Sequence, residues 1–171
     1  MEDNSFFDTR NFTSACLALR SAARSTTQFY DLVLQPVGLK ATQFIALRTI
    51  ADAGELQQWK FARQHAIAVE TLSRRLAVLR RRGLVSARTG GNHGERIYTL
   101  TDQGRKLLEE AIPYWERAEK RLSQTMGKSE LRLLVRLCET AVAAARQAEQ
   151  LRAMNINIEN VHIASNHAAV A

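Results

Sequence analysis

The sequence predicts a mainly α fold that carries one small β-hairpin. Three observations lead to this prediction. Apolar residues recur at helical spacing through most of the 171 residues. The alternation typical of strands appears only in one stretch after Gly83, and that stretch contains a glycine-rich joint. Hydrophobic residues make up 46% of the chain and charged residues 24%, so a packed core is expected.

The first third of the chain predicts a long helix. Its seven-residue apolar repeat consists of Phe12, Cys16, Leu19, Ala23, Thr26, Tyr30 and Val33. A second apolar stripe lies beside the first, which indicates packing both within the domain and against a partner. Pro36 and Gly38 end this helix, and a shorter one is expected from about Thr42 to Gly54.

The middle of the chain predicts a helix-turn-helix followed by a hairpin. A short helix around Phe61 precedes a second helix whose apolar stripe is Leu72, Leu76 and Leu79, and Gly83 ends it. Residues 84–88 and 96–100 read as strands, and the joint between them contains three glycines and an asparagine. A hairpin in this position is a wing, so the segment predicts a winged helix-turn-helix domain.

The last third is expected to be helical again. Thr101 is a candidate N-cap for a helix that runs towards Met126, although Gly104 stands where a capping box would have Glu. Gly127 breaks this helix, and Ser129 is expected to cap a final one. Residues 155–171 have no helical apolar period, and we expect them to be either disordered or an arm.

Positive charge is concentrated in the middle of the chain. The net charge is +7, and residues 56–105 alone hold 10 Lys/Arg against 3 Asp/Glu, a net of +7. Residues 1–55 have a net charge of −1 and residues 106–171 a net of +1. A localised basic patch favours a polyanion as partner, because neutralising phosphates releases condensed counterions.

Several other classes of protein are not expected. No run approaches the ~18 apolar residues of a membrane span, and the acidic start lacks a signal-peptide profile, so we expect a cytoplasmic protein. Cys16 and Cys138 are too few for a disulfide framework. The four histidines lack companions at metal-ligand spacing, and no motif of an enzyme is present. We expect no metal, no cofactor and no catalytic site.

Three segments of the chain carry a family resemblance. They read CLALRSAARSTTQFYDLVLQPVGLKATQF at 16–44, ETLSRRLAVLRRRGLV at 70–85 and YTLTDQGRKLLEEAIPYWERAE at 98–119. In this order and spacing they resemble the MarR (multiple-antibiotic-resistance regulator) family of bacterial transcription regulators. The resemblance covers roughly residues 10–150. It implies a homodimer on palindromic double-stranded DNA, which many members release when they bind a small aromatic or anionic ligand.

The resemblance completes the expected domain organisation. Residues 40–104 form the winged helix-turn-helix DNA-binding domain, and 6–36 with 105–154 form a helical dimerisation region. Residues 155–171 are a separate C-terminal tail. The function expected is that of a sequence-specific regulator, a repressor in its usual form, in the bacterial cytoplasm and on the nucleoid.

Residues of the second helix and the wing are the candidate DNA contacts. The N-terminal part of a recognition helix meets base edges in the major groove, and an arginine there can fork onto guanine. A cationic wing can follow the backbone or enter the minor groove. The candidates are Thr71, Ser73, Arg74, Arg75, Arg88, Asn92, His93 and Arg96. The family commonly has an Asp-x-Arg pair in the wing, where this chain has Asn92-His93-Gly94.

Two further roles follow from the resemblance. Cys16 matches the reactive cysteine of a peroxide-sensing branch, and Tyr30 matches a tyrosine that bonds its thiolate. Arg20 and Ala41 stand where that branch has two other tyrosines. Cys16 is alternatively a small apolar residue in a dimer seam. Candidate effector-pocket residues, each alternatively plain core, are Leu19, Phe29, Phe44 and Trp59.

Two alternatives therefore stand beside a ligand-released repressor. One is a thiol-based peroxide-sensing repressor that acts through Cys16. The other, of a different class, is a nucleoid or RNA-binding protein without operator preference.

Overall fold

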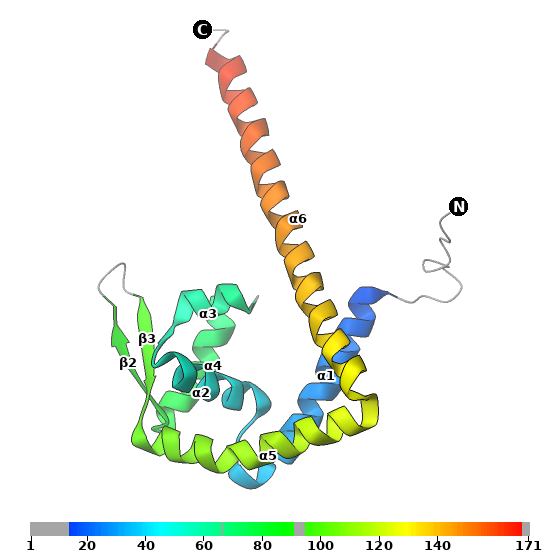
Figure 1. The fold of residues 1–171 in the computed structure, drawn as a ribbon. Coiled ribbons are helices and arrows are strands. Elements are labelled where there is room, and N and C mark those ends of the chain that lie inside the picture. The colour runs from blue at the N-terminus through cyan, green and yellow to red at the C-terminus, as the bar shows by residue number, and fades with distance from the viewer. Residues whose placement is uncertain (1–13, 66, 91–94, 169–171) are drawn as a thin grey trace, which may run out of the picture. The chain divides into compact units, whose positions relative to one another are not determined.

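The computed structural model describes residues 14–65, 67–90 and 95–168, with side chains as far as 150 and at 152. The chain divides into two compact units, residues 1–121 and residues 122–171. Among the described residues, the first unit holds the first four α-helices, the three strands and most of the fifth helix. The end of that helix, from residue 122, and the sixth helix belong to the second unit (Figure 1). The mainly α fold with a small β-hairpin is confirmed.

The first helix, α1 (Ala15–Val33), is joined to α2 (Ala41–Ala53) by the short 3-10 helix η2 (Gln35–Val37). Gly38 closes η2 with φ +63, a left-handed value that glycine adopts without strain. Asp31 of α1 then accepts a hydrogen bond at 2.7 Å from the backbone N–H of Ala41, the first residue of α2. Because that N–H lacks a partner within the helix, Asp31 serves as a cap supplied by the preceding helix. The expected break at Pro36 and Gly38 is confirmed.

The helix-turn-helix consists of α3 (Gln58–Gln64) and α4 (Val69–Arg81). Helix α4 buries Leu72, Leu76 and Leu79, the three leucines of the predicted stripe. Gly83 follows with φ +70, so the expected left-handed end of this helix is confirmed. The core of the unit forms around these leucines together with Leu34, Leu47, Ile50, Leu84 and Tyr98.

The sheet has three antiparallel strands in the order β1-β3-β2. Strands β2 (Val85–Thr89) and β3 (Arg96–Leu100) form the predicted hairpin, in register from Val85 opposite Leu100 to Thr89 opposite Arg96. The third strand, β1 (Leu56–Gln57), pairs with the other edge of β3. This strand was not predicted, because two residues are too short to show an alternating pattern.

Helix α5 (Asp102–Met126) begins as predicted at Thr101, whose hydroxyl accepts a hydrogen bond from the Gly104 N–H at 3.0 Å. The Thr101 hydroxyl also donates to the Gly83 carbonyl at 2.6 Å, which ties the start of α5 to the end of α4. The helix continues unbroken past Pro113.

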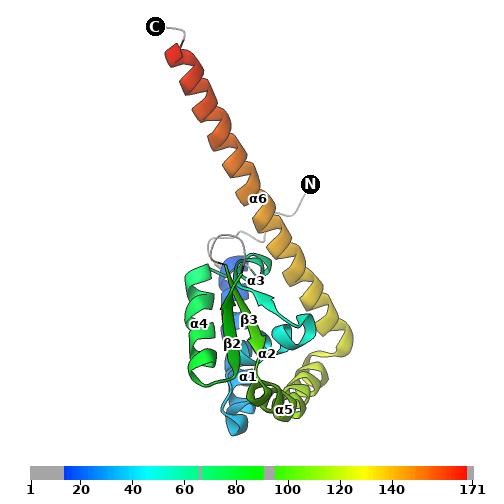
Figure 2. The same cartoon turned by 90° about the vertical axis from the view of Figure 1, so that its left-hand side faces the viewer.

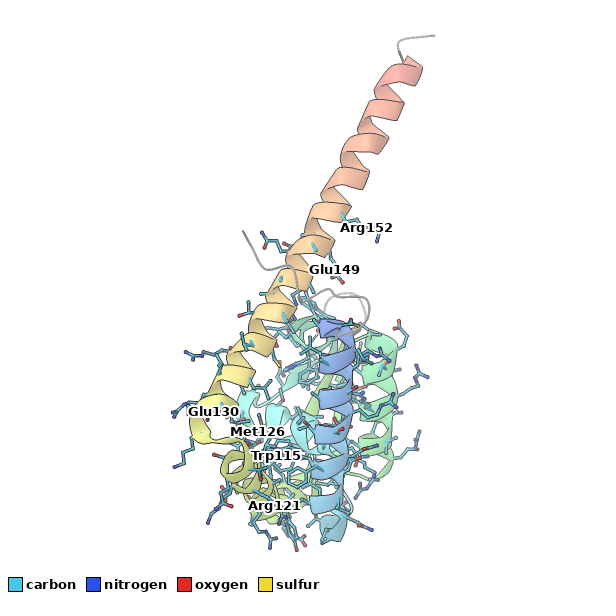
Figure 3. The ribbon with its side chains drawn as sticks, turned by 90° about the vertical axis from the view of Figure 1, so that its right-hand side faces the viewer. Trp115, Arg121, Met126, Glu130, Glu149 and Arg152 are labelled. Carbon is cyan, nitrogen blue, oxygen red and sulfur yellow. The ribbon has the colours of Figure 1, made fainter. Side chains whose placement is uncertain are left out.

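Helix α6 (Lys128–Ala168) makes up most of the second unit and follows Gly127, which has φ +94. Ser129 lies inside the first turn of α6 and was wrongly expected to precede the helix as its cap. Its hydroxyl donates to Glu130 and lowers the pKa of that carboxyl group. Figure 3 shows Glu130 near the start of α6 and Glu149 and Arg152 further along it.

Residues 155–168 continue α6, which differs from the separate tail expected for 155–171. The absence of an apolar period was the reason for that expectation. However, residues 128–171 contain neither glycine nor proline, so nothing in the sequence stops the helix once it has begun. Residues 169–171 lie outside the described part of the chain.

No helix formed by the described residues is long and apolar enough to cross a membrane.

Candidate nucleic-acid interface

Helix α4 presents one apolar face to the core and one basic face outward. Leu72, Leu76 and Leu79 are buried, whereas Arg74, Arg80 and Arg81 are exposed. Figure 2 shows α4 beside the β2–β3 hairpin, which leaves its outer side uncovered by other elements of this unit. An amphipathic helix whose polar face is dominated by guanidinium groups suits an anionic partner.

The candidate base contacts of α4 lie in its first two turns. The Arg74 side chain is exposed, and its Nε donates weakly to the Glu70 carbonyl at 3.4 Å. Thr71, Ser73 and Arg75 are half-buried. These exposures agree with Arg74 as the most outward of the four side chains and with Arg75 on the flank of the helix.

Gln58 connects the two helices of the helix-turn-helix motif. It is the first residue of α3 and only 7% exposed, and among the described residues it is the one buried residue whose side chain is an amide or a charged group. Its amide nitrogen donates to the hydroxyl of Ser73 and, at 3.4 Å, to the backbone carbonyl of Val69. Gln58 therefore holds the first turn of α4, where base contacts are expected.

The other end of α4 is tied to the loop between α1 and α2. The guanidinium Nη1 of Arg82 donates to the Gly38 carbonyl at 2.9 Å. Arg82 therefore has a structural partner, whereas Arg80 and Arg81 project from the last turn of the helix, where cations stabilise the dipole.

The wing arginines differ in their surroundings. Arg88 on β2 forms an ion pair with Glu55, with Nη2 and Oε2 2.7 Å apart. Because β3 lies between β1 and β2, this pair reaches across the middle strand to the residue before β1. Arg96 on β3 is exposed. The other two candidate wing contacts, Asn92 and His93, lie outside the described residues.

An aromatic cluster lies where α1, α2 and α5 meet. The Tyr30 and Phe44 rings both contact the Trp115 ring, with centroids 4.3 Å and 4.4 Å away, and Phe29 meets Tyr30 edge-on at 5.5 Å. Two candidate effector residues, Phe29 and Phe44, thus share one cluster. The structure does not add the other two to it, because Leu19 and Trp59 are exposed to solvent.

Tyr30 is buried and bonded to α5. Its hydroxyl donates to Glu119 Oε1 at 2.6 Å, and only 5% of the residue is exposed. Burial, and then the hydrogen bond and charge of Glu119, raise the pKa of Tyr30 well above its usual value. The phenol is therefore held in its neutral form as a hydrogen-bond donor.

Cys16 is far from Tyr30 within one chain. The two residues are fourteen apart on α1, which is about 21 Å along a helix axis. Cys16 is exposed on the first turn, whereas the Tyr30 hydroxyl is committed to Glu119. Within a single chain the structure therefore does not bring together the two residues of the expected redox pair.

Three residues near the site were missed by the sequence analysis. Glu55, Gln58 and Glu119 act through partners that are 33, 15 and 89 residues away respectively. No local spacing signals such contacts. Only the composition offered a hint, since Glu55 is one of few carboxylates near the basic segment.

Within the part of the chain that the structure describes, no group of three His, Cys, Asp or Glu side chains could hold a metal ion.

Solved structures similar to this one are transcriptional regulators. The M. tuberculosis transcriptional regulator MosR, crystallised with DNA, is 32% identical and has a TM-score of 0.68. That match covers 77% of this chain and 98% of MosR. No protein-family model and no curated protein matches this chain.

Two further structures resemble the fold at lower identity. A mutant of E. coli MarR in complex with operator DNA is 18% identical, with a TM-score of 0.64 over 72% of this chain and 90% of MarR. Bordetella bronchiseptica BpsR, whose DNA binding is regulated by 6-hydroxynicotinic acid, is 22% identical. Its TM-score is 0.65 over 78% of this chain and 96% of BpsR.

Proposed function

This chain belongs to the MarR family of winged helix-turn-helix transcriptional regulators, and from that membership we propose that it binds a palindromic operator as a homodimer and is released by a small-molecule effector. It is a DNA-binding transcription regulator and not an enzyme. Repression is the simplest mode of action, since a dimer seated on a promoter blocks access to it. Its place of action is the bacterial cytoplasm, on the nucleoid.

The exposed arginine-bearing face of α4 is the observation that carries this proposal. Arg74 reads a base edge in the major groove, because it projects from the second turn of a helix whose other face is fully buried. Thr71 and Ser73 supply hydroxyl contacts, and Arg75 supports the helix from its flank. MosR, the 32% identical relative, was crystallised with DNA.

The wing extends the interface along the duplex. Arg88 and Arg96 are exposed cations on its two strands, and Asn92 and His93 belong to its joint. Such residues neutralise phosphates or enter the minor groove without reading sequence in detail. We therefore assign base preference to α4 and general affinity to the wing.

Homodimerisation is supported by uncovered apolar residues on two helices. Helix α1 exposes Leu17, Leu19 and Leu32, and helix α6 exposes Leu133, Val135, Leu137 and Val142. Apolar surface on this scale usually belongs to an interface. Residues 6–36 and 105–154 form the proposed dimerisation region, with 40–104 as the DNA-binding domain. A dimer presents two α4 helices to half-sites about 34 Å apart.

The effector we propose is a small aromatic or anionic molecule. The regulation of BpsR by 6-hydroxynicotinic acid supports this class of ligand. Candidate lining residues are Leu19, Phe29, Phe44 and Trp59, and the aromatic cluster around Phe44 suits an aromatic ring. A ligand there acts by favouring a spacing of the two α4 helices that mismatches the half-sites. Release of labelled operator by 6-hydroxynicotinate and by simple phenols tests this part directly.

The decisive experiment selects bound fragments from the host genome and compares Arg74→Ala with the unmodified protein. We expect a palindromic operator, and a loss of about 1–3 kcal/mol with relaxed base preference for Arg74→Ala. Arg80→Ala, at the far end of the same helix, is the matched control and should keep the preference. Selection of fragments without a common sequence would instead favour a nucleoid or RNA-binding protein, and a stable monomer would contradict the dimer.

A further inference from the structure

We propose that Gln58 directs the hydrogen of the Ser73 hydroxyl towards DNA, so that Ser73 favours an acceptor atom over a donor. This inference rests on the proposed function, in which α4 enters the major groove. It states that Ser73 is the donor in its contact with DNA. It also assigns a positioning residue, Gln58, which lies on α3 and acts through Ser73.

The orientation of the Gln58 amide follows from its second partner. The same nitrogen, Nε2, lies 3.4 Å from the Val69 carbonyl oxygen and contacts Ser73 Oγ. A carbonyl oxygen can only accept, so the group that faces it must be the NH₂ and not the amide oxygen. The NH₂ group is a donor, and the Ser73 oxygen is therefore the acceptor in this pair.

That assignment leaves Ser73 with its hydroxyl hydrogen to offer. A serine in a helix commonly donates this hydrogen to the carbonyl four residues before it, as Thr27, Thr49 and Thr140 do here. For Ser73 that carbonyl belongs to Val69, which the Gln58 amide already occupies. In the described residues Ser73 makes no other side-chain hydrogen bond. The half-buried hydroxyl is thus free to donate outward.

The chemistry of the acceptor can be stated. In the major groove, acceptors are N7 and O6 of guanine, N7 of adenine and O4 of thymine, whereas the amino groups of cytosine and adenine are donors. Phosphate oxygens are acceptors as well. A serine of unfixed polarity serves any of these groups. With Gln58 in place, an acceptor satisfies the Ser73 hydrogen, whereas a donor could use only the remaining lone pair of the oxygen and would leave that hydrogen without a partner.

The test is a double-mutant cycle on operator affinity with Ser73→Ala, Gln58→Met and the double variant. Methionine is unbranched and similar in length, so it fills the space without donating a hydrogen bond. We expect each single variant to weaken operator binding by about twofold to tenfold, the range of one neutral hydrogen bond. The double variant should bind nearly as Ser73→Ala does, because the other contact of Gln58, to the Val69 carbonyl, is long at 3.4 Å and Ser73 is its main partner. Ser73→Thr, which keeps the hydroxyl, should restore most of the affinity.

Two modified operators test N7 and the phosphate oxygen as the acceptor. Duplexes with 7-deazapurines lack N7, and duplexes with methylphosphonate linkages lack the charged phosphate oxygen. On the duplex that lacks the true acceptor, the unmodified protein and Ser73→Ala should bind equally. Thermal melting of each variant, measured at one protein concentration, separates these effects from loss of folding.

Several outcomes would overturn the inference. One is unchanged operator affinity of Ser73→Ala, and another is unchanged affinity of a folded Gln58→Met variant. The third is a fold-loss of affinity in the double variant that equals the product of the two single fold-losses. If the unmodified protein bound no duplex preferentially, the proposed function would fail first, which is a distinguishable result.

Discussion

Gly104 and Leu84 approach so closely that a side chain at position 104 would place its Cβ 1.9 Å from the Leu84 carbonyl oxygen. This contact joins the first turn of α5 to Leu84, the residue before β2. It is reinforced by the Thr101 N–H, which donates to the same carbonyl at 3.2 Å. The missing side chain at position 104 is therefore a condition for this packing, and backbone atoms cannot rotate away as a side chain could.

We expect Gly104→Ala to destabilise the protein by about 1–3 kcal/mol, the usual cost of overpacking. Gly90→Ala is the matched control. Its added Cβ would lie 3.0 Å from the flexible Cδ1 end of Ile97, which can yield. Urea unfolding at one fixed protein concentration measures both variants, because a dimer's stability depends on concentration. Equal stability of the two variants would contradict the argument.

The Tyr30–Glu119 hydrogen bond predicts a particular dependence of stability on pH. The pKa of Tyr30 is raised in the folded state, so its contribution is complete below the unfolded pKa of about 10 and is lost as pH rises through the folded pKa. Tyr30→Phe should lose about 0.5–1.5 kcal/mol at pH 8. It should also decline less steeply than the unmodified protein above pH 10. Unfolding curves at several alkaline pH values test this, and parallel declines would refute it.

The ion pair between Arg88 and Glu55 predicts that the Glu55 carboxylate weakens DNA binding, because it competes with phosphate for Arg88. Arg88 is 59% exposed and Glu55 39% exposed, so the pair is open to competition from phosphate. Glu55→Gln should strengthen binding to duplexes of any sequence. It should also steepen the salt dependence by roughly 0.9 in log K against log salt, the value for one more phosphate contact.

The matched control for Glu55→Gln is Asp52→Asn. Asp52 pairs with Arg48 on α2 at 3.0 Å, so this variant also removes one negative charge beside an arginine. Its partner Arg48 lies on α2 and not on the wing, so we expect little change in the salt slope of this variant. An identical response of both variants would show that net charge alone matters, and weaker binding of Glu55→Gln would show that the pair supports the wing.

We expect peroxide not to release this protein from DNA through Cys16. Within one chain the thiol is about 21 Å along the helix from Tyr30, and the Tyr30 hydroxyl is engaged by Glu119. Stoichiometric organic hydroperoxide is added to the operator complex of the unmodified protein and of Cys16→Ser. Release of the unmodified protein alone would restore the redox hypothesis.

The sequence predicted what depends on local spacing and missed what depends on distant partners. The stripe Leu72, Leu76 and Leu79 and the glycine at 83 predicted α4 because each signal lies within a few turns of the next. Gly104 was noticed as an unexpected residue in a capping position. Its reason is the backbone of Leu84, which no pattern around position 104 could reveal.

The DNA-facing candidates divide in the same way. Arg74 was predicted from its place in an amphipathic helix, and its exposure agrees with that prediction. The pairing of Arg88 with Glu55 and of Ser73 with Gln58 depends on how β1 and α3 fold back, and β1 itself is only two residues long. Helix α6 continues past the boundary expected at residue 155, because no glycine or proline stops it where the apolar pattern ends.

The hydrogen bond from Arg82 to the Gly38 carbonyl couples the end of α4 to the connector between α1 and α2. A displacement of that connector acts on the C-terminal end of α4 through this bond, and it does not require Leu72, Leu76 and Leu79 to leave the core. The link is made at Gly38, whose φ of +63 a glycine adopts without strain. A partner that binds α1 can therefore change, through this hydrogen bond, the angle at which α4 meets the DNA duplex.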